Sequence, residues 1–360
     1  MSTKPDLSQI HDEDLLEELK ALDGNFLYDR LAGMLVSRQK ERDQKKALEQ
    51  ARQDQLAAMP RDARRRAKAQ DVLAATAENP QNLRHIHSVL ALCGLPYTRQ
   101  PLDAREFHRK QGRMNLIVKA GELMSPNDEW IAQPLPYGSR ARLLLLHLCS
   151  EAIRQKSPTI HIEDSLTAFL RNMGFPATGG ARGTLTAFKQ QVNALAACTM
   201  KIGTWDGAKA TTLNTSPFTS IDVWFPTDPD QKILWPSTIT FSRDFYDTLS
   251  KHALPVNTHA IRAFAGSPRK IDIYYWLTHR LHNLNAPLHI SWDALREQFG
   301  EGYNRDRAFR AQFREELEHI REVFPKVPAK LSEKGLTIQP ADPSVLAIPA
   351  RRPAKITQRR

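Results

Sequence analysis

The most informative stretch for the fold is residues 288–324, LHISWDALREQFGEGYNRDRAFRAQFREELEHIREVF. Leu288-His289-Ile290 reads as a short strand, and Ser291 then caps a helix that ends before the glycine-rich turn at 300–304, because serine favours helix N-caps and glycine favours C-termini. From Arg305 to Phe324, large apolar residues recur at three- and four-residue steps. That spacing predicts a long amphipathic helix, so the stretch reads as strand, helix, turn, helix.

The flanking segments extend this pattern. Residues 271–282 form an apolar helical stripe before it, and residues 327–331 and 336–339 are strand-like runs on either side of a turn. Helix, strand, helix, turn, helix and hairpin is the element order of a winged helix.

The same order occurs earlier in the chain. We expect helices at 140–154, 166–173 and 181–197, a strand at 158–162, and strand-like runs at 199–204, 211–215, 219–225, 233–235 and 238–241. The two regions share little residue identity, so a duplicated fold is a better description than a sequence repeat.

These patterns predict an α+β, mainly α, fold with two tandem winged-helix domains. The expected organisation is a charged helical or partly disordered arm at 1–80 that forms no core, a connecting segment at 81–138, the first winged-helix-like domain at 139–253, the second at 254–340, and a basic disordered tail at 341–360. Within the connecting segment, apolar spacing over 83–92 indicates a helix, and 114–118 and 130–135 read as strands.

The charge balance favours a polyanion as partner. Lys and Arg number 51 against 40 Asp and Glu, which gives a net charge of +11. The three cysteines are widely spaced in apolar surroundings, which indicates buried free thiols rather than zinc ligands or disulfides. The N-terminus lacks an apolar signal core, and no apolar run is long enough to span a bilayer, so we expect a cytoplasmic protein without membrane contact.

The last helix of each winged-helix pattern is the candidate for base contacts, since that helix enters the major groove in helix-turn-helix folds. Arg307, Arg310 and Arg314 follow i, i+3, i+7 spacing and share one stripe, opposite Phe309 and Phe313. Arginines near a helix start oppose the macrodipole, which indicates an anionic partner. The alternative is a solvated helix with pairs such as Arg314 to Glu318.

The candidate DNA-binding residues come from both regions. The corresponding helix of the first region is less basic, and it could read bases, pack against a second subunit, or do both. The full candidate set is Arg182, Thr184, Thr186, Lys189 and Gln190 in the first region, and Tyr303, Arg305, Arg307, Arg310, Arg314, Lys330 and Lys334 in the second.

Enzyme motifs are weak. Gly179-Gly180-Ala181-Arg182-Gly183-Thr184 lacks phosphate-loop spacing, so we expect no ATPase activity and no cofactor or metal. One alternative is a metal-dependent nicking enzyme, because His85 and His87 flank one apolar residue and Tyr97, Tyr274 or Tyr275 could be its nucleophile. Such a pair must lie on a strand, whereas the apolar spacing indicates a helix.

Several stretches between Gln100 and Ile348 resemble a known family. The most specific is Pro136-Tyr137-Gly138-Ser139-Arg140-Ala141-Arg142, supported by Met114-Asn115-Leu116, Gly174-Phe175, Thr178-Gly179-Gly180, Phe241-Ser242, Leu254-Pro255-Val256 and Tyr274-Tyr275-Trp276-Leu277. On these residues the chain resembles the RepA-type plasmid replication initiators of Gram-negative bacteria, members of the RepA C-terminal family with tandem winged helices.

The resemblance implies a non-enzymatic protein that binds repeated sites in double-stranded DNA at a plasmid origin and helps melt the adjacent DNA. It implies host replication proteins, an initiator and a helicase, as partners, and a homodimer through the first winged-helix domain. Repression of its own gene, alone or together with initiation, remains open, because a repressor could have the same fold. The resemblance identifies no DNA contacts residue by residue.

Overall fold

The structure is a computed structural model that describes residues 5–348 apart from 77–78, 126–127, 162, 176–177, 179–182, 206 and 222–237. The chain divides into two compact units, residues 1–64 and residues 65–360. The fold is mixed α and β with a helical N-terminal region, as the sequence predicts at that level. Within the described ranges, no helix combines the length and the hydropathy needed to cross a membrane.

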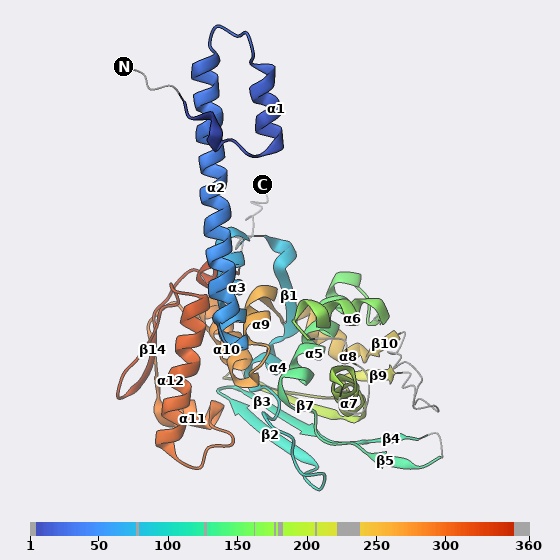
Figure 1. The fold of residues 1–360 in the computed structure, drawn as a ribbon. Helices are drawn as coiled ribbons and strands as arrows, with labels where there is room; N and C mark the ends of the chain where they lie inside the picture. Colours follow the sequence, from blue (N-terminus) through green and yellow to red (C-terminus); the bar gives the residue numbers. More distant parts are fainter. Residues whose placement is uncertain are drawn as a thin grey trace, which may run out of the picture. The chain divides into compact units, whose positions relative to one another are not determined.

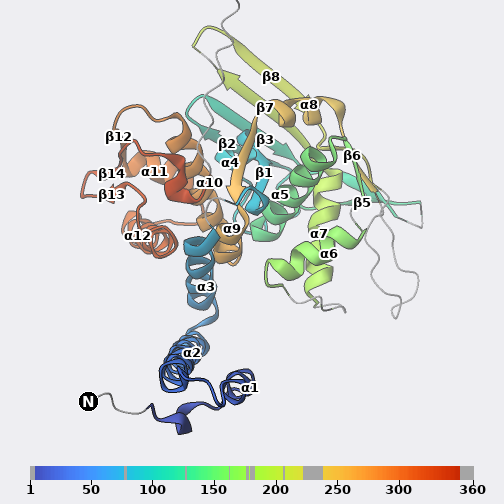
Figure 2. The ribbon, with the colours of Figure 1, turned by 90° about the horizontal axis from the view of Figure 1, so that it is seen from above.

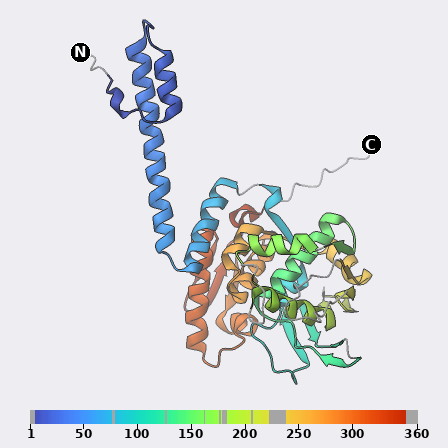
Figure 3. The same ribbon diagram turned by 45° about the vertical axis from the view of Figure 1, so that its right-hand side comes forward.

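The first unit is helical and has a small core of its own. It contains η1 (Leu7–Gln9), α1 (Glu13–Ala21) and α2 (Tyr28–Ala58), with α1 packed alongside α2 (Figures 1 and 3). Ile10, Leu15, Leu35 and Val36 are buried together. The prediction that residues 1–80 form no core is therefore wrong here, because the apolar residues of α1 and of the first turns of α2 are close enough to pack.

The second unit contains nearly all of the remaining elements. The next helix is α3 (Arg61–Thr76), which includes the boundary between the units, and its Ala69 and Leu73 are buried in the second unit's core. The other helices are η2 (Pro80–Asn82), α4 (Ser88–Cys93), α5 (Gly138–Gln155), α6 (Glu163–Asn172), α7 (Thr184–Ala197), α8 (Arg243–Lys251), α9 (Thr258–Phe264), α10 (Pro268–Asn283), α11 (Trp292–Phe299), α12 (Asp306–Val323) and η3 (Pro343–Leu346).

Its strands form several small antiparallel sheets (Figure 2). They are β1 (Leu83–His87), β2 (Glu106–Gln111), β3 (Met114–Lys119), β4 (Glu122–Met124), β5 (Trp130–Ala132), β6 (Thr159–His161), β7 (Thr199–Trp205), β8 (Ala210–Thr215), β9 (Phe218–Ile221), β10 (Thr238–Phe241), β11 (Ala253–Asn257), β12 (Leu288–Ser291), β13 (Ala329–Leu331) and β14 (Gly335–Ile338). The expected strand at 233–235 lies outside the described residues.

Two parts of this unit share an element order and a sheet order. The first half, residues 138–241, begins with α5, β6, α6 and α7. Its strands β6, β10 and β9 form one sheet in that order. The second half, residues 268–338, begins with α10, β12, α11 and α12. Its strands β12, β14 and β13 form one sheet in that order. In each sheet the last strand lies between the other two. The first half also contains the hairpin β7–β8, which joins β2 and β3 in a separate four-stranded sheet.

The helix predicted over 83–92 is only half right. Residues 83–87 form β1, which pairs along its whole length with β11, and α4 begins only at Ser88. The apolar positions 83, 86, 89 and 90 fit a helical period, but the pairing with a distant strand decides the conformation. Strand β2 has alternating exposed and covered residues with little apolar content, and the sequence did not indicate it.

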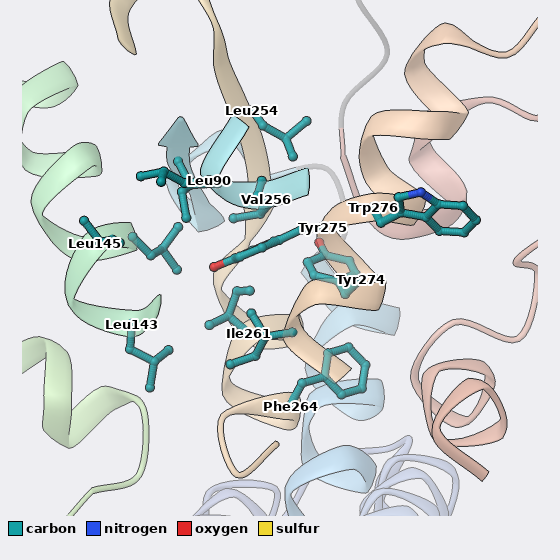
Figure 4. Close-up of a cluster of buried hydrophobic side chains, with 14 of the residues drawn as sticks. Leu90, Leu143, Leu145, Leu254, Val256, Ile261, Phe264, Tyr274, Tyr275 and Trp276 are labelled. Carbon is teal, nitrogen blue, oxygen red and sulfur yellow. The ribbon is translucent and has the colours of Figure 1, made fainter. Parts of the chain in front are cut away.

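One hydrophobic core spans both halves. Figure 4 shows Tyr275 of α10 pointing toward Leu143 and Leu145 of α5, whereas Trp276 points to the other side of α10. The three cysteines, Cys93, Cys149 and Cys198, are buried and free, as predicted.

The C-terminal end of this core corrects the expected tail. Residues 343–346 form η3, and Leu346 and Ile348 are buried. Asn257 Nδ2 donates a hydrogen bond to the Ala347 carbonyl (3.2 Å). Disorder from Asp342 is therefore wrong for these residues, because apolar side chains between the prolines reach the core. Residues 349–360 lie outside the described residues.

Candidate nucleic-acid interface

Helix α12 presents a basic face beside a buried aromatic face. Phe309 and Phe313 are buried, whereas Arg307 and Arg314 are exposed and Arg310 is half-buried. Arg305 is exposed at the N-cap position. The predicted arginine stripe therefore lies on the side of the helix that points away from the core.

Trp292, at the start of α11, holds two of these arginines. The guanidinium carbons of Arg310 and Arg314 lie 5.4 and 5.5 Å from the centre of its ring, which is cation–π distance. Phe309 and Phe313 pack edge-on against the same ring. Trp292 is 4% exposed, so the indole is fixed by the core while its ring supports both cations. Sequence reasoning treated Trp292 only as part of a helix start.

The hairpin β13–β14 is tied to the same indole. Trp292 Nε1 donates a hydrogen bond to the Ser332 carbonyl (3.1 Å) in the turn between the two strands. Lys334 is exposed in that turn, and Lys330 is exposed on β13 opposite Thr337. Trp292 therefore contacts both the α12 arginines and the hairpin that carries the two lysines.

The turn before α12 is held by Arg296 and Arg269. Arg296 forms an ion pair with Asp306 and donates to the carbonyls of Tyr303 (3.3 Å) and Asn304 (3.4 Å). The Tyr303 hydroxyl lies 3.2 Å from Arg269 Nη1, and its ring lies 4.7 Å from that guanidinium. Tyr303, one of the candidate DNA contacts, is thus engaged within the fold.

A buried acid faces the inner side of α12. Glu316 is 3% exposed and its Oε1 lies 3.5 Å from Arg269 Nη1. Burial raises the pKa of Glu316 from 4.5 to about 7, although Arg269 and Lys270 oppose the shift. This carboxyl belongs to the core and not to the basic face.

The first half presents a weaker version of this surface. Arg182 lies outside the described residues. On α7, Gln190 is exposed, but Thr184, Thr186 and Lys189 are half-buried, and burial lowers the pKa of Lys189 from its ordinary value. Thr178 Oγ1 accepts a hydrogen bond from the Thr184 backbone N–H (3.1 Å) at the helix start. The polar face of α7 is therefore partly covered by its own neighbours.

The Pro-Tyr-Gly-Ser-Arg-Ala-Arg motif has a structural role. Its Arg142 is 3% exposed and makes a two-bonded ion pair with Asp272 of α10, with both distances 2.7 Å. The same guanidinium donates to the carbonyls of Leu95, Pro96 and Gly138. Gly138 has φ +72°, a conformation that favours glycine. The motif thus joins α5 of the first half to α10 of the second half.

A ring of arginines surrounds one buried tyrosine next to this pair. The guanidinium carbons of Arg109, Arg142 and Arg269 lie 4.9, 5.1 and 4.7 Å from the centre of the Tyr97 ring. Arg109 forms an ion pair with Glu301, whose carboxylate also accepts the Tyr97 N–H (3.1 Å). No sequence pattern indicated this cluster, because its members lie on five separate segments.

The two histidines of the nicking hypothesis lie on a strand after all, contrary to the helix we predicted. His85 and His87 are on β1, where residues two apart share a face. However, His87 Nδ1 accepts the Val89 N–H (3.2 Å) and Nε2 lies 3.2 Å from Thr248 Oγ1. Burial also lowers the pKa of His87 to about 4. Both ring nitrogens are therefore engaged within the fold.

The proposed nucleophiles are no better placed. Tyr97, Tyr274 and Tyr275 are buried, and burial raises the pKa of each hydroxyl above its ordinary value. The Tyr274 hydroxyl accepts the Asn257 N–H (2.9 Å). Across the part of the chain that the structure describes, no three His, Cys, Asp or Glu side chains form a group that could hold a metal ion.

A comparison with protein families agrees with the resemblance seen in the sequence. Residues 135–294 match the family model RepA_C, described as plasmid encoded RepA protein. No curated protein matches the chain. A structure search finds the crystal structure of selenomethionine derivatives of domain 2 and domain 3 of RctB, with 11% sequence identity, 70% of this chain and 97% of that chain covered, and a TM-score of 0.43.

The matched residues include the whole first half and all of α10, with the Arg142–Asp272 ion pair between them. The resemblance to RepA-type plasmid replication initiators is thus confirmed by the family match over residues 135–294.

Proposed function

We propose that this protein initiates plasmid replication by binding double-stranded DNA at the origin, with α12 as the main base-reading helix. The observation that carries the proposal is the pair Arg310 and Arg314 held over Trp292 beside the β13–β14 hairpin. Arginine forms bidentate hydrogen bonds with guanine in the major groove, and a fixed guanidinium pays less entropy on binding.

The two halves support the finer proposal of tandem winged helices. Each has three helices and a three-stranded sheet in which the last strand lies between the other two. In this reading α7 and α12 are equivalent helices, and the hairpin β13–β14 is a wing that brings Lys330 and Lys334 to the DNA backbone. Domain limits at 139–253 and 254–340 remain part of the proposal.

The remaining parts of the proposal rest on the family match. They are binding of repeated sites, recruitment of a host initiator and helicase, dimerisation through the first half, repression of the protein's own gene, and a cytoplasmic location. The half-buried face of α7 fits a role shared between DNA and a second subunit.

A non-enzymatic mechanism is proposed over nicking. The internal hydrogen bonds of His87 and the burial of the three tyrosines favour a structural role for these residues. Relaxation of supercoiled origin plasmid with magnesium or manganese, lost in a His87→Ala variant, would overturn this part of the proposal.

The test is footprinting over the DNA that flanks the gene, followed by affinity measurements on the protected sites. We expect regularly spaced protected sites, and loss of protection in the Arg310→Ala/Arg314→Ala double variant. Arg262→Ala is the matched control, since Arg262 is exposed on α9 of the same unit. A single palindromic site would favour a repressor, and an unaffected double variant would remove α12 from the recognition role.

A further inference from the structure

The four-stranded sheet β2-β3-β7-β8 has one face in the core and one open to solvent. Leu116, Val118, Met200 and Ile202 point inward and are buried. The opposite residues of each strand are exposed or half-exposed. The duplex-binding proposal makes no use of this open face.

Strand register places polar and basic side chains in rows on that face. One row runs Lys110, Asn115, Gly203 and Thr212, and the next runs His108, Ile117, Lys201 and Asn214. Lys110 and Lys201 are both exposed. The face is therefore positive at two neighbouring rows and suits a polyanion.

A hollow of about 340 Å³ lies at the end of these rows. Its lining includes Lys110, Arg113, Gly203, Trp205 and Thr212. Trp205 is 47% exposed, which is unusual for so large an apolar ring, and it flanks the hollow on the same face as Gly203. An aromatic ring beside basic side chains is the combination that stacks bases and neutralises phosphates in single-strand binding.

Gly203 keeps the hollow open. A Cβ added there would meet its nearest neighbour, Asn115 Cβ, at 3.6 Å, which is ordinary contact. A larger side chain at 203 would therefore fill the hollow without forcing the sheet apart.

We propose that this hollow binds a nucleotide of single-stranded DNA, with the base stacked on Trp205 and the flanking phosphates at Lys110 and Lys201. A strand fits better than a free nucleotide, because Lys201 lies four residues from Trp205 along β7, roughly 13 Å at the rise of a strand. An open sheet face with one exposed aromatic ring suits splayed bases and not a closed duplex. The proposal goes beyond duplex binding and requires none of the α12 arginines.

The test measures fluorescence anisotropy of a labelled oligo(dT) of about 15 nucleotides, a length that covers one typical single-strand site. We expect Trp205→Ala and Gly203→Val each to weaken binding about tenfold, since base stacking on one aromatic residue supplies this order of affinity. Lys201→Glu should weaken binding by a similar factor and reduce its salt dependence.

Matched controls come from the same chain. Trp130→Ala removes a tryptophan that is 67% exposed on β5, and Lys45→Glu reverses an exposed lysine on α2, and both variants should keep full affinity for the oligonucleotide. Arg310→Ala should also keep it, so failure of the duplex proposal and failure of this proposal are distinguishable.

Three results would overturn the inference. One is unchanged oligo(dT) affinity in both Trp205→Ala and Gly203→Val. A second is binding of ATP without binding of oligo(dT), detected as quenching of tryptophan fluorescence that Trp205→Ala abolishes. A third is loss of self-association in sedimentation for Trp205→Ala with oligo(dT) affinity retained, which would assign the face to a second copy of the chain.

Discussion

Helices α7 and α12 occupy the same place in the element order of two halves, yet they present different surfaces. On α12, Arg307 and Arg314 are exposed and Arg310 is supported by Trp292. On α7, Thr184, Thr186 and Lys189 are half-buried. The same order of helices and strands therefore leaves one helix available to a large partner and the other partly covered.

The two halves also differ in the strands that follow these helices. Strands β7 and β8 follow α7 directly, and β7 pairs with β3, so the first half is joined to a sheet that the second half lacks. In the second half, α12 leads straight to the short hairpin β13–β14.

The largest expected effect comes from removing the ion pair that links the two halves. Arg142→Ala should lower the free energy of unfolding by about 3–5 kcal/mol, because it leaves Asp272 buried without its partner. Urea denaturation measures this loss. Arg38→Ala, which removes an exposed ion pair with Glu18, is the control and should cost under about 1 kcal/mol. An equal effect of both variants would contradict a central role for the motif.

The two halves should also respond to pH in opposite directions. Glu316 has a folded pKa of about 7 against 4.5 unfolded, so its contribution is full below pH 4.5 and is lost as pH rises toward 7. His147 of α5 has a folded pKa of about 4, lowered mainly by burial, against 6.5 unfolded, so its contribution is present above pH 6.5 and is lost as pH falls toward 4.

Glu316→Gln isolates the first of these effects. Relative to the wild type, the variant should gain about 2–3 kcal/mol in unfolding free energy between pH 4.5 and pH 7, because the neutral amide has no proton to lose. Urea denaturation at several pH values measures the difference. Parallel pH profiles for the two proteins would show that Glu316 titrates normally in the folded state.

Alanine substitutions on α12 and α7 test which helix contributes more to duplex binding. Arg310→Ala should weaken specific duplex binding by about 1–3 kcal/mol if it reads a base. Lys189→Ala and Gln190→Ala on α7 should weaken it less, since Lys189 is half-buried. Electrophoretic mobility shifts on the footprinted site measure all three. A larger loss on α7 would reverse the assignment of the main reading helix.

The smallest expected effect concerns the support under the arginines. Trp292→Phe should reduce the ratio of specific to non-specific affinity by about 0.5–1 kcal/mol, because a smaller ring without an N–H holds two guanidiniums less firmly. Trp276→Phe is the matched control, since Trp276 is also buried and lies 5.6 Å from Arg280. A similar loss of specificity in both variants would indicate general destabilisation.

Apolar spacing in the sequence predicted the long helices, because a helix is held by contacts between residues that are close in sequence. The long helix after Arg305 and the helix from Arg140 follow from apolar spacing, and both occur at nearly the expected residues. The conformation of residues 83–87 could not be predicted this way, since the partner strand β11 decides it. The arginine stripe was visible in sequence, but its support by Trp292 arises only when α11 packs against α12.

The pairing of β1 with β11 has a consequence for how the chain is made. Leu83 pairs with Asn257, and His85 also donates its N–H to Ser150 on α5. At a synthesis rate of roughly 5–20 residues per second, β1 waits on the order of 10 to 35 seconds for its partner strand to be translated. Until then β1 lacks the strand that pairs with it in the folded protein. A chain truncated before residue 253 lacks β11 entirely, so β1 would have no strand to pair with.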